Sequence, residues 1–206
     1  MAQDFQRVSL NDETIIRGPA RFLWAGITIA MPSNIGGVIN LSTYAAQTGW
    51  NDFGATKTGV QIERNNTEQT IDVDQVLTDI DSFPQGWTLT VQTSLSEMNL
   101  ENVSVAWQGS PVTTMTAEGS AVTQKRMGIG APVFYTRRRL AILHQRTSGL
   151  IRAIVLRRVN RSPQASAFTY DKAGDQLVAP VRFEAFADLS VSDVDYRFGE
   201  IWDQAT

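Results

Sequence analysis

Side chains with intrinsic chemical reactivity are scarce in this sequence. The chain has one histidine and no cysteine among its 206 residues. His144 follows Leu143 in a run of apolar residues, so we interpret it as a hydrogen-bonded core or interface group and not as a base. Without cysteine, and with one histidine, the common zinc sites, the disulfides and the histidine-based triads are all but excluded. The sequence therefore gives little support to an enzyme.

Acidic side chains are concentrated between Asp72 and Asp81, in the run DVDQVLTDID. This run superficially suggests a calcium-binding loop, but the glycine and the final glutamate of the EF-hand are missing from their required positions. Two carboxylates could also serve a hydrolase, provided that they face each other across a cleft. We interpret these acids instead as the solvated face of a strand.

Composition and charge limit the partners that the chain can have. The formal net charge is −3, which argues against non-specific binding to duplex DNA, because such binding needs a basic face. No basic and then apolar leader opens the chain, and no apolar run approaches the roughly 18 residues of a membrane span. We expect a soluble protein with no membrane partner and no cofactor.

The segment from Gly49 to Trp107 carries the strongest periodic signal. Apolar and polar residues alternate around Val60, around Ile71 and from Trp87 onwards, which is typical of strands with one buried face. Turn-forming residues separate these runs, so the pattern predicts a meander of three strands. The predicted turns are Arg64-Asn65-Asn66-Thr67 and Phe83-Pro84-Gln85-Gly86.

An amphipathic helix is predicted to follow the meander, over about Leu95–Trp107. Ser94 and Glu97 have the spacing of a capping box, and Gly109 is a typical helix terminator. Further strands are predicted in both halves of the chain. They comprise a strand within residues 14–31, a hairpin of residues 140–145 and 150–156 with Gly149 in its turn, a strand over residues 176–188 that has a bulge or lies at an edge at Pro180, and a strand within residues 191–202.

Three segments are predicted to lack regular structure. Residues 1–13 read as a flexible N-terminal arm, and residues 31–50 and 109–132 as long loops. The loop of residues 31–50 is too apolar to be simply disordered, so it either folds back on its own sheet or lies on another subunit. Arginines gather at the ends of the 140–156 hairpin, where we expect them to pair with acidic neighbours or with an acidic subunit edge.

Several short motifs, taken in their order and spacing, resemble the tail tube (major tail) proteins of bacteriophages with long non-contractile tails. The resemblance covers about the last three-quarters of the chain. The matching segments are GWNDFGAT from Gly49, Gly59-Val60, TIDVDQ from Thr70, the threonine-rich strand at Trp87, SLSE from Ser94 with Glu101-Asn102, RRLAILHQ, and LVAPVRFEAFAD from Leu177.

This resemblance implies one tail-tube-like domain over residues 1–206, mainly β, with a β-sandwich or barrel-like fold and one flanking helix. It also implies a virion structural protein that assembles in the host cytoplasm into stacked hexameric rings. The resulting tube conducts the genome to the host cell without binding it specifically. Its other partners would be the tape measure, the tail tip or initiator, and the terminator.

Two sets of residues are candidates for roles in such a tube. Acidic residues of the meander are predicted to line the lumen, where they would repel the passing phosphates: Glu63, Glu68, Asp72 and Asp74. Residues of the 31–50 loop and the arginine-rich hairpin are predicted to contact neighbouring subunits: Ile35, Val38, Leu41, Tyr44, Arg137, Arg139 and Arg157.

Other classes of function also fit parts of the sequence. One alternative is the tube protein of a related injection machine, such as a type VI secretion system. Another is a carbohydrate-binding β-sandwich module, although the five tryptophans are scattered along the chain. An enzyme ranks third.

Overall fold

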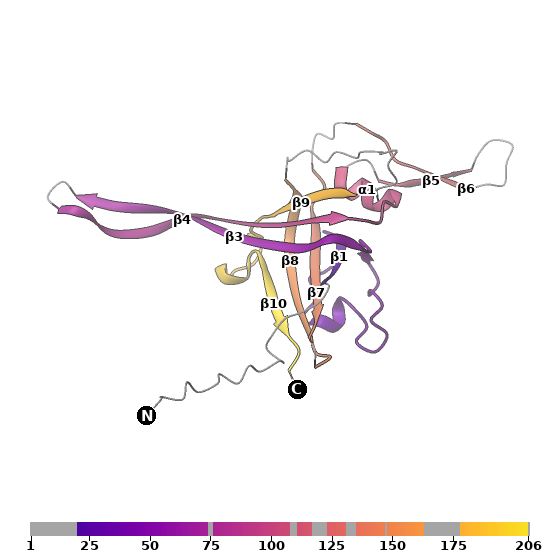
Figure 1. The fold of residues 1–206 in the computed structure, drawn as a ribbon, viewed down its shortest axis with the longest axis horizontal. Coiled ribbons are helices and arrows are strands. Elements are labelled where there is room, and N and C mark those ends of the chain that lie inside the picture. Colours follow the sequence, from indigo (N-terminus) through magenta and orange to yellow (C-terminus); the bar gives the residue numbers. More distant parts are fainter. Residues whose placement is uncertain are drawn as a thin grey trace, which may run out of the picture.

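The fold is mainly β, as the sequence predicts, and has one α-helix in the part of the chain that the structure describes. The structure is a computed structural model that describes residues 20–73, 76–107, 111–116, 123–130, 135–146, 148–162 and 178–205. Its strands in chain order are β1 (Ala20–Gly26), β2 (Trp50–Asp52), β3 (Thr56–Val73), β4 (Val76–Leu95), β5 (Thr113–Thr116), β6 (Thr123–Arg126), β7 (Arg138–Gln145), β8 (Ile151–Arg161), β9 (Ala179–Ala185) and β10 (Gly199–Asp203). Its helices are the 3-10 turns η1 (Ile35–Gly37) and η2 (Val194–Tyr196) and the α-helix α1 (Leu100–Trp107) (Figure 1).

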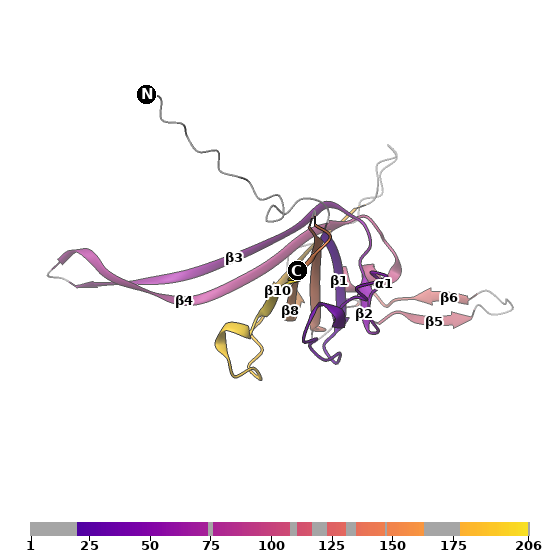
Figure 2. The same ribbon diagram turned by 90° about the horizontal axis from the view of Figure 1, so that it is seen from below.

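One antiparallel sheet of eight strands organises the molecule. Its strands follow the order β2-β1-β7-β8-β9-β4-β3, and β10 pairs with β8 off this path. A separate two-stranded hairpin, β5–β6, projects from the side of the body opposite the β3–β4 hairpin (Figures 1 and 2). The β7–β8 hairpin confirms the predicted one, and Gly149 in its turn adopts the left-handed conformation, with φ of 85°.

The sheet curls around a first core of aromatic and aliphatic side chains. Phe22 of β1 and Phe183 of β9 lie three strands apart in the sheet, which would separate them by about 14 Å if the sheet were flat. Their ring centroids are only 5.9 Å apart, and Phe53 stacks on Phe22 at 4.6 Å. The curl therefore brings β9 and β4 over β1, β7 and β8, and buries Val91 and Leu95 between them.

A second core covers the opposite face of β1, β7 and β8. Leu23 of β1 and Leu143 of β7 point to this side, where Ile35, Val38 and Ile39 of the connection between β1 and β2 cover them. These strands are therefore apolar on both faces because both faces are covered, as predicted for the 140–156 hairpin. The predicted loop of residues 31–50 thus folds back, in this part, on its own sheet.

The helix is shorter than predicted, because β4 continues to Leu95. Leu95 is fully buried and pairs with Ala179 of β9, so tertiary packing keeps Ser94 and Leu95 in the strand. The predicted capping box is therefore wrong. The helix begins at Leu100, and the side chain of Asn99 accepts a hydrogen bond from the amide of Asn102 at 2.7 Å.

The predicted three-stranded meander is also wrong, because β3 and β4 form one long hairpin. Arg64 to Thr67 lie inside β3, and Phe83 to Gly86 lie inside β4. The register shifts between Thr67 and Glu68, opposite Pro84 to Gly86, so the turn-forming residues of β4 make a bulge instead of a turn.

Strand β9 agrees with the predicted alternation: its odd-numbered residues, from Ala179 to Ala185, are buried. At Pro180 the strand pairs with β4, and its pairing with β8 covers Phe183 to Ala185. Two other predictions need correction. The segment of residues 109–132 contains β5 and β6, and Val194 lies in η2 instead of a strand. The predicted N-terminal arm of residues 1–13 lies outside the described residues.

Candidate assembly surface

His144, the histidine of the chain, lies in the main sheet. His144 is 8% exposed in β7, which agrees with the predicted burial, but its Nε2 lacks the predicted hydrogen bond in the described part of the chain. Among the described residues, no group of three or more potential ligands could hold a metal ion. Within the same residues, no helix has both the length and the apolar character needed to cross a membrane.

The most unusual surface belongs to the outer part of the β3–β4 hairpin, residues 63–73 and 76–88, which we call the arm. Every side chain described here, in residues 63–71 and 81–88, is exposed. The arm extends far beyond the body and packs on no other described element (Figures 1 and 2). Because a lone two-stranded hairpin is only marginally stable in water, an ordered arm calls for a surface on which to pack.

Large apolar side chains on the arm also lack cover. Ile71, Phe83 and Trp87 are 43–45% exposed. The guanidinium of Arg64 lies 4.1 Å from the ring centroid of Trp87 and covers it only in part. These residues are consistent with a surface that contacts another molecule, since exposed apolar clusters are uncommon on monomers.

Of the predicted lumen residues, Glu63 and Glu68 are exposed on the arm. They accept hydrogen bonds from the side chains of Asn65 and Asn66 respectively. The prediction placed these acids on two adjacent strands, whereas Glu63, Glu68 and Asp72 all lie on β3. Asp72 belongs to β3 without a described side chain, and Asp74 lies outside the described residues.

Open strand edges are a second feature that could support assembly. In the described residues, β2 and β3 end the sheet, and β10 pairs only with β8. Unpaired edges are a hazard for a soluble monomer, because their amides and carbonyls can recruit another strand. The chain therefore offers backbone hydrogen-bonding groups that a second copy could complete.

The predicted contact residues of the 31–50 loop divide into two groups. Ile35 is 7% exposed and Val38 is fully buried, so both stabilise this chain's own core and offer little surface to a neighbour. Leu41 and Tyr44 are each 45% exposed. Tyr44 has a φ of 56°, and its carbonyl accepts a hydrogen bond from Arg21, which fixes the loop against β1. A contact role therefore stays a prediction for Leu41 and Tyr44.

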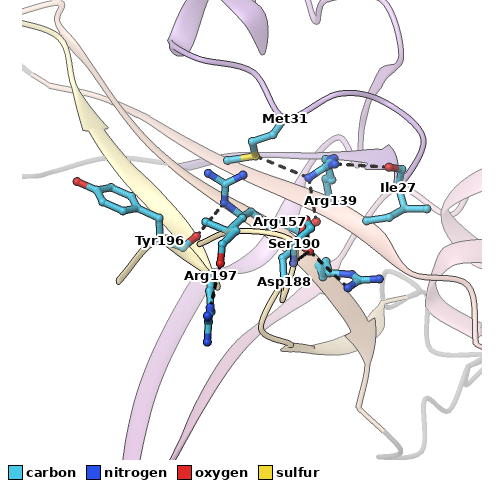
Figure 3. A network of polar contacts seen from close by, with 10 residues as sticks. Ile27, Met31, Arg139, Arg157, Asp188, Ser190, Tyr196 and Arg197 are labelled. Atoms are coloured by element: carbon cyan, nitrogen blue, oxygen red, sulfur yellow. Dashed lines mark hydrogen bonds and ion pairs between the residues drawn. The ribbon is translucent and has the colours of Figure 1, made fainter. Parts of the chain in front are cut away.

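Two of the three candidate arginines form hydrogen bonds or ion pairs within the chain (Figure 3). Arg139, 9% exposed, donates to the carbonyls of Ile29 at 2.7 Å and Arg157 at 3.2 Å. Burial lowers the pKa of Arg139 below its usual value. Arg157 forms an ion pair with Glu200. Arg137 remains exposed and has no ion-pair partner among the described residues.

Arg146, Arg152 and Arg158 pair with acidic residues of the same chain, which is one of the two predicted alternatives. Arg152 forms a two-fold ion pair with Asp203, at 2.6 and 2.7 Å, and Arg146 contacts the same carboxylate. Arg158 lies 3.5 Å from Asp188. Hydrogen bonds from Ser190 hold the pKa of Asp188 below its ordinary value, with a smaller contribution from Arg158. These contacts attach the C-terminal segment to β8.

Comparison with models of known protein families and with curated proteins finds no match for this chain.

Proposed function

We propose that this chain is a structural subunit that assembles with copies of itself into the tail tube of a bacteriophage. The observation that carries the proposal is the arm, because a long exposed hairpin with uncovered apolar residues gains stability only against another surface. The open edges of β2, β3 and β10 support it, since a ring of copies would pair them. The resemblance of its motifs to tail tube proteins supports the same class.

In this proposal the tube consists of stacked hexameric rings in the virion, and other tail proteins act at its ends. The arm supplies acidic side chains to the lumen, Glu63 and Glu68 among them. The arm twists along its length (Figures 1 and 2), so residues of opposite parity on β3 can face the same side. A negative wall would repel the phosphates of the genome and let it pass without being held.

Electron microscopy tests the proposal directly. The purified chain is concentrated and viewed by negative stain, and its mass is followed by sedimentation velocity. We expect rings or tubes of uniform diameter that increase with concentration. A folded chain that stays monomeric at every concentration would contradict the proposal.

A matched variant isolates the contribution of the arm. Arg64 pairs directly with Leu89 across the hairpin, so residues 65–88 can be replaced by a two-residue Asn-Gly turn. We expect this shortened chain to fold and to remain monomeric under the conditions in which the full chain assembles. Assembly of the shortened chain into the same tubes would show that the arm is not the contact element.

A further inference from the structure

Arg138, the first residue of β7, carries a positive charge that no carboxylate of the described residues neutralises. Trp24 of β1 pairs with Leu140, and Arg138 lies two residues before Leu140, so the side chains of Trp24 and Arg138 share one face of the sheet. The guanidinium of Arg138 lies 4.5 Å from the centroid of the Trp24 ring. Stacking on a ring leaves the N–H groups at the edge of the guanidinium available to an acceptor.

Burial makes this unpaired charge costly. Arg138 is half-buried, and burial lowers its pKa below the usual value, while no described carboxylate raises the pKa again. A cation that loses water without gaining a counter-ion is destabilised, so an anion from outside would be favoured. Arg64 provides a contrast, because it stacks on Trp87 at 4.1 Å but lies exposed on the arm.

Arg138 lines a cleft of about 460 Å³, which we call the Arg138 cleft. Its walls come from β1, β7, α1 and the β5–β6 hairpin, and α1 lies beside the base of that hairpin (Figures 1 and 2). The uncharged residues of the lining that matter here are Trp24, Pro111, Val112, Thr114 and Thr136. A cleft of this volume is large enough for a small organic ligand.

The other two charged residues of the Arg138 cleft compensate each other. Lys125 of β6 forms an ion pair with Glu101 of α1 at 2.5 Å, which also connects the hairpin to the helix. The lining therefore has the single net positive charge of Arg138, which matches a monoanion. A phosphate dianion would leave a surplus negative charge in the same cleft.

The geometry of the guanidinium and the nature of the walls narrow the ligand further. A planar guanidinium can donate two parallel hydrogen bonds to the two oxygens of a carboxylate. Trp24, Pro111 and Val112 offer apolar surface to the rest of the ligand. Thr114 and Thr136 add hydroxyl groups to the polar part of the lining.

We infer that the Arg138 cleft binds a carboxylate that is attached to an apolar group. This binding goes beyond the proposed self-assembly and does not depend on it. The carboxylate has two possible sources, namely a free organic acid or an acidic side chain that lies beside an apolar one on a second copy of this chain. Both are recognised by the same chemistry, so one probe tests the site.

Benzoate is the probe, because it joins one planar carboxylate to an apolar ring. Its binding to the purified full chain is titrated by saturation-transfer NMR, at a protein concentration below that of assembly. We expect a Kd of about 1 mM or tighter, and at least about tenfold weaker binding of the neutral benzyl alcohol. Equal binding of the two compounds, or no binding of benzoate at about 10 mM, would overturn the inference.

Substitutions locate the site. Arg138→Gln should weaken benzoate binding at least about tenfold, because the charge is lost. Thr114→Phe should weaken it similarly, because a larger side chain fills the cleft while Arg138 stays in place. Arg64→Gln is the matched control, since it also removes an arginine stacked on a tryptophan, and it should leave binding unchanged.

Circular dichroism shows whether each variant folds, and Thr114→Phe decides if Arg138→Gln does not. Benzoate should also raise the melting temperature of the natural chain more than that of a folded Arg138→Gln chain. Undiminished binding by folded Arg138→Gln or Thr114→Phe, or an equal loss in Arg64→Gln, would show that the ligand does not bind in the Arg138 cleft.

Sedimentation velocity with and without saturating benzoate then identifies the source of the carboxylate. If benzoate and Arg138→Gln each weaken self-association at least about tenfold, the natural ligand is a second copy. If benzoate binds and assembly is unchanged, the natural ligand is a free acid. A chain that binds benzoate but never assembles would support the cleft and contradict the tube, whereas a chain that assembles but binds no benzoate would overturn the cleft alone.

Discussion

Asn102 shows how one buried polar side chain can join three segments. It is 1% exposed, and its Nδ2 donates to the carbonyls of Phe53 at 2.8 Å and Glu97 at 2.9 Å. The side chain thus connects α1 to the end of β4 and to the residue that stacks on Phe22. Buried carbonyls that lose their donor are costly, so Asn102 is a determinant of stability.

Replacing Asn102 with Ala should therefore lower the free energy of unfolding by about 2–4 kcal/mol, because it leaves two carbonyls without that donor. Urea unfolding followed by circular dichroism would measure the change. Asn65→Ala, on the exposed arm, is the matched control and should change stability by less than about 0.5 kcal/mol. If Asn102→Ala changed the free energy of unfolding as little as Asn65→Ala does, the two hydrogen bonds of Asn102 would not contribute to stability.

Asp203 gives a pH-dependent contribution to stability. Hydrogen bonds from Arg152, and then from Arg146, lower the pKa of Asp203 from 3.8 to about 2. A depressed folded-state pKa stabilises the fold above about pH 4, and this contribution is lost as the pH falls toward 2. The side chain is 42% exposed, so solvent screening keeps the contribution below about 1 kcal/mol.

We expect Asp203→Asn to lower the melting temperature at pH 7. The difference in melting temperature between the variant and the natural chain should become smaller between pH 4 and 2.5. Thermal unfolding at several pH values provides the measurement. Asp195→Asn, which removes an exposed acid that has no ion-pair partner among the described residues, serves as control. A difference that stays constant over this range would contradict a role for the ion pair.

At the scale of elements, the arm is the feature that sequence patterns missed. Asn65, Asn66 and Pro84 are typical turn residues, but here they lie in long strands. The two asparagines hydrogen-bond to Glu63 and Glu68 on the same strand, and Pro84 lies at the bulge. A ribbon with two open edges accepts a residue without an amide donor, because no third strand needs that donor.

The shortened chain, with Asn-Gly in place of residues 65–88, should keep nearly all of its stability. The side chains described in this segment, up to Thr88, are exposed, and the first core begins with Leu89 and Val91. We expect a free energy of unfolding within about 1 kcal/mol of the full chain, measured by urea unfolding of the monomer. Loss of cooperative unfolding would show that the arm belongs to the folding unit.

At the scale of the molecule, charge determines whether an assembled tube would bind DNA. The net charge of −3 and the acidic arm predict that tubes do not retain duplex DNA. Co-sedimentation of tubes with a short duplex at about 0.15 M salt would measure retention. Glu63→Lys/Glu68→Lys tubes should retain it, because the lumen would then hold cations. Unchanged behaviour of this variant would place both acids away from the lumen.

The sequence by itself determined the local alternation of the strands and the composition of the molecule. It predicted the β7–β8 hairpin, the left-handed turn at Gly149 and the buried face of β9, because each depends on neighbours in sequence or on period two. It also indicated that reactive side chains are scarce. These properties follow from the order of the residues alone.

Only the tertiary structure decided where the regular elements end and which residues remain exposed. Leu95 continues a strand because it pairs with Ala179, and Val38 is buried because the sheet beneath it is apolar on both faces. The exposure of Val194 and Ile129 likewise depends on how the chain closes on itself. Burial and long-range pairing involve residues that are far apart in sequence, so local sequence patterns do not predict them.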